Sequence, residues 1–270
     1  IILRTLVIVA ACITGGTLLY IVGYILINGI PHLSPELFSW EYNSENLSML
    51  PSIINTLIIT ALSLIIAVPL GIFSAIYLVE YAKRGNKLVG IIRITAETLS
   101  GIPSIVYGLF GMLFFVTALN MDYSILAGSL TMCIMILPLI MRTTEEALKS
   151  VPDIYREGSF GLGAGRLRTV FRVVLPSAVP GILAGVILSI GRIVGETAAL
   201  IYTAGTFADI PESIMDSGRT LSVHMYTLSR EGLHIDQTYA TAVVLLIVVI
   251  LINSLSALVA KRITKRRGEA

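Results

Sequence analysis

Long apolar runs recur along the whole chain, and no other feature restricts its possible folds as strongly. A helix needs about 20 consecutive apolar residues to cross the hydrocarbon core of a bilayer. Six such runs predict six transmembrane helices, over residues 5–30, 53–79, 94–119, 124–141, 177–206 and 240–260. Because 55% of the residues are hydrophobic and only 13% are charged, a soluble fold could not bury this much apolar surface. We therefore predict an all-α integral membrane protein, which excludes a soluble enzyme, a nucleic-acid-binding module and a disordered chain.

The first apolar run, residues 5–30, raises the question of whether it is a cleaved signal sequence. It is longer than the roughly 7–15 apolar residues of a signal-peptide core, and no small-residue cleavage site with a soluble domain follows. We therefore expect it to remain in the protein as a membrane anchor. Because the chain begins at Ile1 without a methionine, we also expect that a few leading residues are missing.

Positive charge is unevenly divided between the two sides of the predicted spans. Sixteen of the 19 lysines and arginines lie before the first span, in the second or fourth connection, or after the sixth span. The other connections hold only Arg219 and Arg230 among the basic residues, and Arg192 lies inside the fifth span. Because cytoplasmic loops carry the excess of lysine and arginine, we predict that both termini are cytoplasmic and that residues 31–51 and 207–239 lie outside.

The spans also predict the organisation of the chain. A peripheral first helix, residues 1–30, and an extracytoplasmic loop, residues 31–52, precede a five-helix core at 53–260. The core includes a long cytoplasmic loop at 142–176, and a basic cytoplasmic tail at 261–270 follows it.

Motifs for catalysis, nucleotide binding and metal binding are absent from the sequence. There is no G-x-x-x-x-G-K-[ST], G-x-S-x-G or H-E-x-x-H, and the glycine-rich segment 161–165 lacks the P-loop lysine. Cys12 and Cys133 lie inside apolar runs, so we interpret them as small packing residues. All three histidines lie in the predicted outer loops, where we expect them to be solvated: His32, His224 and His234. We therefore expect no metal, no cofactor and no enzymatic activity, which leaves transport or scaffolding.

The cytoplasmic segment 142–176 is long for a bare connector and predicts a short helix that starts at Pro152 and Asp153. After that start come Glu157-Gly158-Ser159, three residues, Gly163, nine residues, Val173, one residue and Leu175-Pro176. This spacing resembles the E-A-A-x3-G-x9-I-x-L-P loop of ABC-importer permeases, with glycine and serine in place of the two alanines and valine in place of isoleucine. In that family the loop forms a coupling helix that docks into a groove on a separate cytoplasmic ATPase.

The resemblance implies a set of coupling residues in this loop. They are Arg156, Glu157, Gly158, Ser159, Gly163, Leu175 and Pro176. Small residues at 158, 159 and 163 would allow a close approach to the ATPase, and the charges of Arg156, Glu157, Arg166 and Arg168 would face its polar surface. The alternative is a basic amphipathic loop that lies on anionic lipid.

On a helical wheel, the small and polar residues of the fifth span share one narrow stripe. Its members are Gly181, Gly185, Ser189, Arg192, Glu196, Ala199 and Thr203. We interpret the glycines as helix-packing seams. An arginine near the middle of a membrane costs about 2.5–3.5 kcal/mol, so it must face a partner or a water-filled path. Arg192 either forms a structural ion pair with Glu196, four residues on, or binds an anionic substrate while Glu196 moderates the charge.

Two further strings carry a more specific resemblance. GIPSIVYGLFG at 101–111 and GRIVGETAAL at 191–200, with Asn55-Thr56-Leu57 and the coupling loop, resemble the A-type membrane subunits of phosphate-specific ABC importers over nearly the whole chain. The resemblance implies a type I, MetI-like importer fold in a bacterial or archaeal plasma membrane. It also implies three partners: a second homologous permease subunit, an ATPase dimer and an extracytoplasmic phosphate-binding protein.

The implied function is to pass inorganic phosphate from that binding protein to the cytoplasm. The motif positions imply that Arg192 and Glu196 line the substrate path, and we place Ser189 and Thr203 of the same stripe beside them. Two alternatives remain open. A permease for molybdate or sulfate would keep the coupling loop without needing the Arg192 and Glu196 pair. An ATP-independent carrier or channel would need neither an ATPase groove nor the E-A-A spacing.

Overall fold

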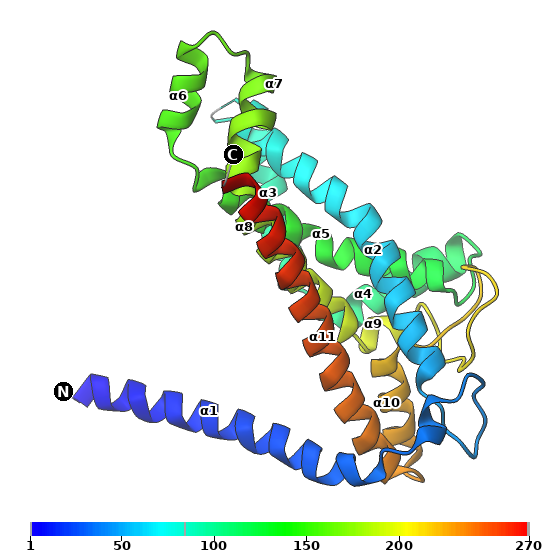
Figure 1. The fold of residues 1–270 in the computed structure, drawn as a ribbon. Helices are drawn as coiled ribbons and strands as arrows, with labels where there is room; N and C mark the ends of the chain where they lie inside the picture. The colour runs from blue at the N-terminus through cyan, green and yellow to red at the C-terminus, as the bar shows by residue number, and fades with distance from the viewer. Residues whose placement is uncertain (1, 84, 269–270) are drawn as a thin grey trace.

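The computed structural model describes residues 2–83 and 85–268, with the side chains of residues 3–83 and 85–262. Of the basic residues predicted to be cytoplasmic, Arg84 and the tail side chains beyond Arg262 lie outside the described residues. The described chain is helical, without strands, and Figure 1 shows its helices. In order they are α1 (Ile2–Gly29), η1 (Ile30–His32), η2 (Pro35–Phe38), α2 (Leu50–Ile76), η3 (Tyr77–Tyr81), α3 (Lys87–Ser100), α4 (Ser104–Gly111), η4 (Met112–Ala118), α5 (Ile125–Lys149), α6 (Asp153–Gly161), α7 (Arg166–Thr169), η5 (Val170–Val174), α8 (Leu175–Val194), α9 (Ala198–Ile201), α10 (Leu221–Glu231) and α11 (Ile235–Gly268).

Five helical segments of the described chain are long and apolar enough to cross a membrane, and a bent pair adds a sixth. They are Leu3–His32, Leu50–Tyr81, Ile125–Lys149, Arg166–Val194 and Ile235–Arg262. The prediction of one continuous third span at 94–119 is wrong, because α3 and α4 meet at an angle of 103°. Pro103 explains the bend, since it has no N–H to donate and disfavours helical backbone at the residue before it.

The predicted fifth span, 177–206, also has the wrong limits. Its helix begins earlier, at Arg166, and α8 ends at Val194, where Gly195 follows. A separate short helix, α9, begins at Ala198, and residue 206 lies outside it. Glycine is a poor helix former, and a wheel drawn through the whole run could not register the interruption.

The centre of the bundle is α5, which packs against both α2 and α8 (Figure 1). Glycines permit the close approach on both sides. A Cβ atom at Gly71 of α2 would lie 2.7 Å from Cγ2 of Ile140, and one at Gly181 of α8 would lie 2.7 Å from Cβ of Ala147. The interpretation of the fifth-span glycines as a packing seam is confirmed at Gly181.

Helix α1 extends away from the bundle and packs only near its C-terminal end, against α11 (Figure 1). The ring centroids of Tyr24 and Tyr239 are 5.8 Å apart at this contact. The rest of α1 is exposed, so an apolar helix is left for lipid or another chain to cover.

The two segments predicted to lie outside pack together at the end of the molecule opposite α6 (Figure 1). Leu37, Leu47 and Met49 of the first segment share one buried apolar cluster with Leu221 and Leu228 of the second. The prediction that all three histidines are solvated is wrong for His224, which is fully buried. Helix α10 turns this side chain toward the segment 31–52, where its ring centroid lies 6.2 Å from that of Tyr42.

Candidate functional site

Helix α6 stands clear of the helix bundle at one end of the molecule (Figure 1). None of its residues is buried, and a Cβ atom at Gly158 would have open space around it. Large apolar side chains are exposed beside it: Ile154 is 70% exposed and Leu162 is 92% exposed. A helix with a small residue and apolar side chains facing outward has the surface of a docking element.

The turn after α6 depends on two of the predicted coupling residues. Gly163 has φ +82°, a backbone conformation that favours glycine, and its N–H donates to the carbonyl of Phe160 (2.9 Å). Oγ of Ser159 lies 2.9 Å from Oγ1 of Thr169 in α7, and Thr169 is buried. Gly163 therefore permits the turn, and Ser159 ties α6 to the helix that follows.

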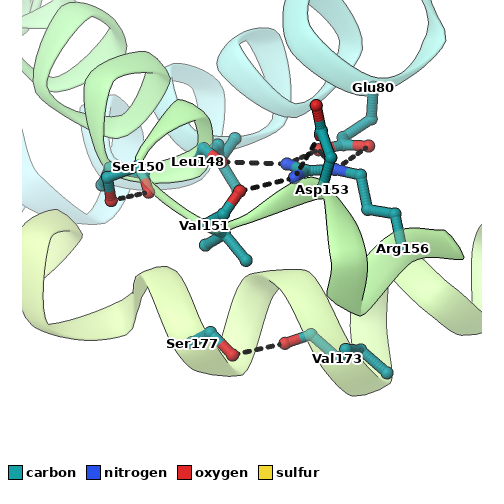
Figure 2. Close-up of polar contacts among 9 residues, drawn as sticks. Glu80, Leu148, Ser150, Val151, Asp153, Arg156, Val173 and Ser177 are labelled. Carbon is teal, nitrogen blue, oxygen red and sulfur yellow. Dashed lines mark hydrogen bonds and ion pairs between the residues drawn. The ribbon is translucent and has the colours of Figure 1, made fainter. Parts of the chain in front are cut away.

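Arg156 attaches α6 to the membrane helices, as Figure 2 shows. Its Nη2 lies 2.7 Å from Oε1 of Glu80 and donates to the carbonyl of Leu148 (2.9 Å). Its Nη1 donates to the carbonyl of Val151 (2.8 Å) and to Oδ1 of Asp153 (3.2 Å). The Arg156 and Glu80 side chains are only 15% and 9% exposed.

These contacts correct one sequence-based prediction. Arg156 does not face outward, because Glu80 and two backbone carbonyls occupy its guanidinium. Three of the predicted docking charges are exposed: Glu157, Arg166 and Arg168. The other two predicted coupling residues, Leu175 and Pro176, form the half-buried first turn of α8.

The fifth span is interrupted between the two charged residues of the predicted path. Arg192 lies in the last turn of α8, whereas Glu196 lies in the break before α9. Oε1 of Glu196 accepts a hydrogen bond from the N–H of Ala199 (3.1 Å), so its carboxylate caps α9. Within the part of the chain that the structure describes, no ion pair joins Arg192 to Glu196. The prediction that one continuous helix carries the whole stripe is therefore wrong beyond residue 194.

The structure separates the other two predicted path residues from this pair. Ser189 and Thr203 are both fully buried. Oγ of Ser189 donates to the carbonyl of Gly185 (2.9 Å), and Oγ1 of Thr203 donates to that of Ala199 (2.8 Å). Both hydroxyls are bound to their own helical backbone, whereas Arg192 and Glu196 are only partly buried.

Arg192 lines an open hollow of about 650 Å³ whose other lining residues are mainly aliphatic. Asn253 of α11 also lines it, and its Oδ1 is buried without a hydrogen-bond partner among the described residues. A Cβ atom at Gly191 would lie 3.8 Å from the Asn253 amide. Sequence reasoning missed Asn253, although an amide inside the sixth apolar run is a signal that could have found it.

A second charged cluster joins α3 to α5. Oε1 of Glu145 lies 2.7 Å from Nε of Arg93 and 2.6 Å from Nζ of Lys149. Glu145 is buried, so its two cationic partners compensate a carboxylate that has lost water. This cluster holds the first half of the bent span against the central helix.

Comparison with known proteins gives one family and a set of relatives. Residues 67–268 match the family described as binding-protein-dependent transport system inner membrane component. The probable ABC transporter permease protein YqgI of Bacillus subtilis is 35% identical over 238 residues, which cover 83% of this chain and 81% of that protein. The phosphate transport system permease protein PstA 1 of Mycobacterium tuberculosis is 35% identical over 215 residues, or 78% of this chain and 70% of that protein.

Solved structures with the same arrangement of helices are more distant in sequence. A chain of the bacterial alginate ABC transporter, solved with a periplasmic protein bound to an alginate pentasaccharide, has a TM-score of 0.68 at 16% identity. The alignment covers 98% of this chain and 97% of that one. A chain of the inward-facing MetNI methionine ABC transporter has a TM-score of 0.63 at 19% identity, with 80% and 94% covered. These likenesses confirm the predicted MetI-like permease fold.

Proposed function

Because the chain belongs to the family of binding-protein-dependent transport system inner membrane components, we propose that it is the permease subunit of an ATP-driven phosphate importer. The multi-pass helical fold and the phosphate permeases among its relatives, at 35–38% identity, support this function. The partners we propose are a second permease subunit, a cytoplasmic ATPase dimer and an extracytoplasmic phosphate-binding protein.

The observation that carries the proposal is α6, an exposed helix held to the membrane helices by the Arg156 to Glu80 ion pair. A loop that merely lies on lipid would not need a buried ion pair to orient it. A helix that transmits movement from an ATPase does need such a pair, because force can pass only through a fixed contact. We propose that Gly158 and its exposed neighbours dock on the ATPase and that Arg156 passes its movement to α2 and α5.

For the substrate, we propose that Arg192 is the cation that phosphate meets inside the membrane. A guanidinium offers five N–H donors in a planar arrangement that matches an oxyanion. It lines a largely apolar hollow and has no ion-pair partner among the described residues. Glu196 moderates the positive charge and fixes the break that ends α8.

The proposed orientation has both termini and α6 in the cytoplasm. A single cysteine at position 45, in a chain whose Cys12 and Cys133 are replaced, should react with an impermeant maleimide only from outside. A cysteine at position 157 is the matched control and should react only from inside. Labelling of position 45 only from the cytoplasm would reverse the whole assignment.

Reconstitution separates the proposed function from its alternatives. The chain should co-purify with an ATPase and a second permease, and vesicles containing the complex and its binding protein should take up labelled phosphate only with ATP. A preference for molybdate or sulfate would identify a permease for another oxyanion. Uptake without any ATPase would identify a carrier or channel.

A further inference from the structure

An open hollow of about 850 Å³ lies on the segment that follows α9, at the end of the molecule opposite α6. Arg219 lines it and is only 4% exposed. Its Nε and Nη2 are buried and have no hydrogen-bond partner among the described residues. Within the same residues, no carboxylate forms an ion pair with it.

The surrounding chain holds this arginine in place. The N–H of Arg219 donates to the carbonyl of Phe207 (2.9 Å). Nδ2 of Asn55 donates to the carbonyls of Asp209 (3.2 Å) and Arg219 (3.3 Å), so one amide of α2 clamps both ends of the segment. The guanidinium carbon lies 4.5 Å from the centroid of the Tyr42 ring. The arginine is therefore positioned in advance rather than free to turn toward water.

A buried guanidinium with unused donors is unfavourable unless something else pairs with it. The Tyr42 ring face supplies part of the compensation but accepts no conventional hydrogen bond. Burial, followed by the positive charge of Arg219, lowers the pKa of neighbouring His224 to about 3. The histidine is therefore neutral at ordinary pH and adds no second positive charge, and the unused N–H donors of Arg219 suit an anion.

We propose that this hollow is an oxyanion site at the outer mouth of the permease, where hydrogen phosphate contacts Arg219 before it reaches the break in the fifth span. The proposal rests on the function proposed above. Three tyrosines, whose hydroxyls can donate to phosphate, are among the residues that line the hollow: Tyr42, Tyr123 and Tyr202. Tyr202 directly follows α9, the helix that Glu196 caps, so only the four residues of α9 separate the hollow from the break. Asp209 also lines it and repels anions, which keeps binding weak and release possible.

Cysteine modification measures this site without transport. The reporter is Thr206→Cys, at an exposed lining position, in an assembled complex lacking Cys12, Cys133 and the binding protein. The probes are a negatively and a positively charged methanethiosulfonate, with inorganic phosphate added at constant ionic strength against chloride. We expect phosphate, but not chloride, to slow the modification. We also expect Arg219→Met to lower, about tenfold, the ratio of the modification rate of the negative reagent to that of the positive reagent.

Two further variants sharpen the test. Arg219→Lys keeps the charge but loses the planar donor set, so the reagent preference should remain while phosphate protection weakens. Asp209→Asn removes the repelling charge and should lower the phosphate concentration for half-protection several-fold. The Asp209 side chain is exposed and makes no hydrogen bond among the described contacts, so this variant keeps the test valid even if Arg219→Met fails to assemble.

Three results would overturn the proposal. One is that phosphate protects the cysteine no better than chloride does, and another is that its protection is the same in Arg219→Met and in Asp209→Asn as without these changes. The third result is that the binding protein protects the cysteine while phosphate does not. The last would mean that Arg219 pairs with a carboxylate of that protein. Uptake distinguishes this failure from failure of the proposed function. A complex that imports phosphate but shows no protection contradicts only the outer site, whereas phosphate protection without phosphate uptake contradicts only the importer.

Discussion

Nη2 of Arg156 lies 2.7 Å from Oε1 of Glu80, which pairs α6 with a residue 76 positions earlier in the chain. Both side chains are largely buried, so each charge depends on the other. Figure 2 shows that the same guanidinium also reaches the end of α5. One side chain therefore holds the exposed helix against two membrane helices.

Removing one member of this pair should loosen α6. Glu80→Gln or Arg156→Met alone leaves a buried charge without its partner, at a cost of about 3–5 kcal/mol. Faster hydrogen exchange of the amides of α6 in the assembled complex would report it. The double variant should recover part of the protection, because no charge is left unpaired. Glu146→Gln is the matched control, since the Arg142 to Glu146 pair is exposed to solvent and should contribute little. Equal exchange in all four variants would contradict this role for the pair.

Gly158→Trp should abolish retention of the ATPase while the chain still inserts and folds. A Cβ atom at this position meets nothing within 4 Å, so the indole disturbs only what docks on α6. The measurement is the amount of ATPase that co-purifies per permease. Glu45→Trp places the same side chain at an exposed position of the outer loop and should retain the ATPase fully. Normal retention in Gly158→Trp would place the interface elsewhere.

Gly163→Ala should strain the turn after α6, because φ is +82° there. An alanine in that conformation costs about 1–2 kcal/mol. We expect lower ATPase retention and faster exchange at residues 159–165. Gly161→Ala is the control, since this glycine also has open space but no positive φ. If the two alanine variants behaved alike, the left-handed turn would have no part in coupling.

The packing of α10 should weaken in mild acid. Burial first and Arg219 second lower the pKa of His224 to about 3 in the folded chain, whereas an unfolded histidine titrates near 6.5. Between these values the unfolded state binds a proton that the folded state does not, so stability falls as pH falls. The loss should reach about 2 kcal/mol by pH 5. Thermal unfolding between pH 7.5 and 5 measures it. His224→Phe should reduce the slope and His32→Phe should not; an equal slope in wild type and His224→Phe would contradict the assignment.

Local patterns predicted the membrane helices because hydropathy and charge asymmetry are properties of short segments. The short helix α6 was predictable for the same reason, since its start signal and the glycines that follow it lie within 14 consecutive residues, 152–165. The features that could not be predicted depend on contacts between segments that are distant in the sequence. Glu80 was not predictable as the partner of Arg156, nor was the burial of His224 against the segment 31–52.

The break in the fifth span shows a different limit. A helical wheel assumes one continuous helix, so it placed Ser189, Arg192, Glu196 and Thr203 on a common face. Gly195 ends α8, and Glu196 caps α9 instead of continuing the stripe. Asn253 went unnoticed, and Arg219 was noted only for its charge, because each is a single polar residue whose importance lies in what surrounds it.

The break also changes how the two charges of the proposed path should be tested. Glu196→Leu would remove the cap of α9 as well as the charge, whereas Glu196→Gln keeps an oxygen that can accept from the N–H of Ala199. Combining Arg192→Met with Glu196→Gln therefore removes both charges with the least damage to the backbone. If Arg192 were only a structural partner of Glu196, this double variant should transport nearly as well as the wild type.

The most direct measurement is the initial rate of ATP-dependent phosphate uptake by Arg192 variants, divided by the amount of assembled complex. We predict background uptake for Arg192→Met, alone or with Glu196→Gln, and partial uptake for Arg192→Lys, which keeps the charge without the planar donors. The ATPase should be retained in every case. Near-wild-type uptake by the assembled Arg192→Met complex would contradict the claim that phosphate contacts this arginine on its way through the membrane.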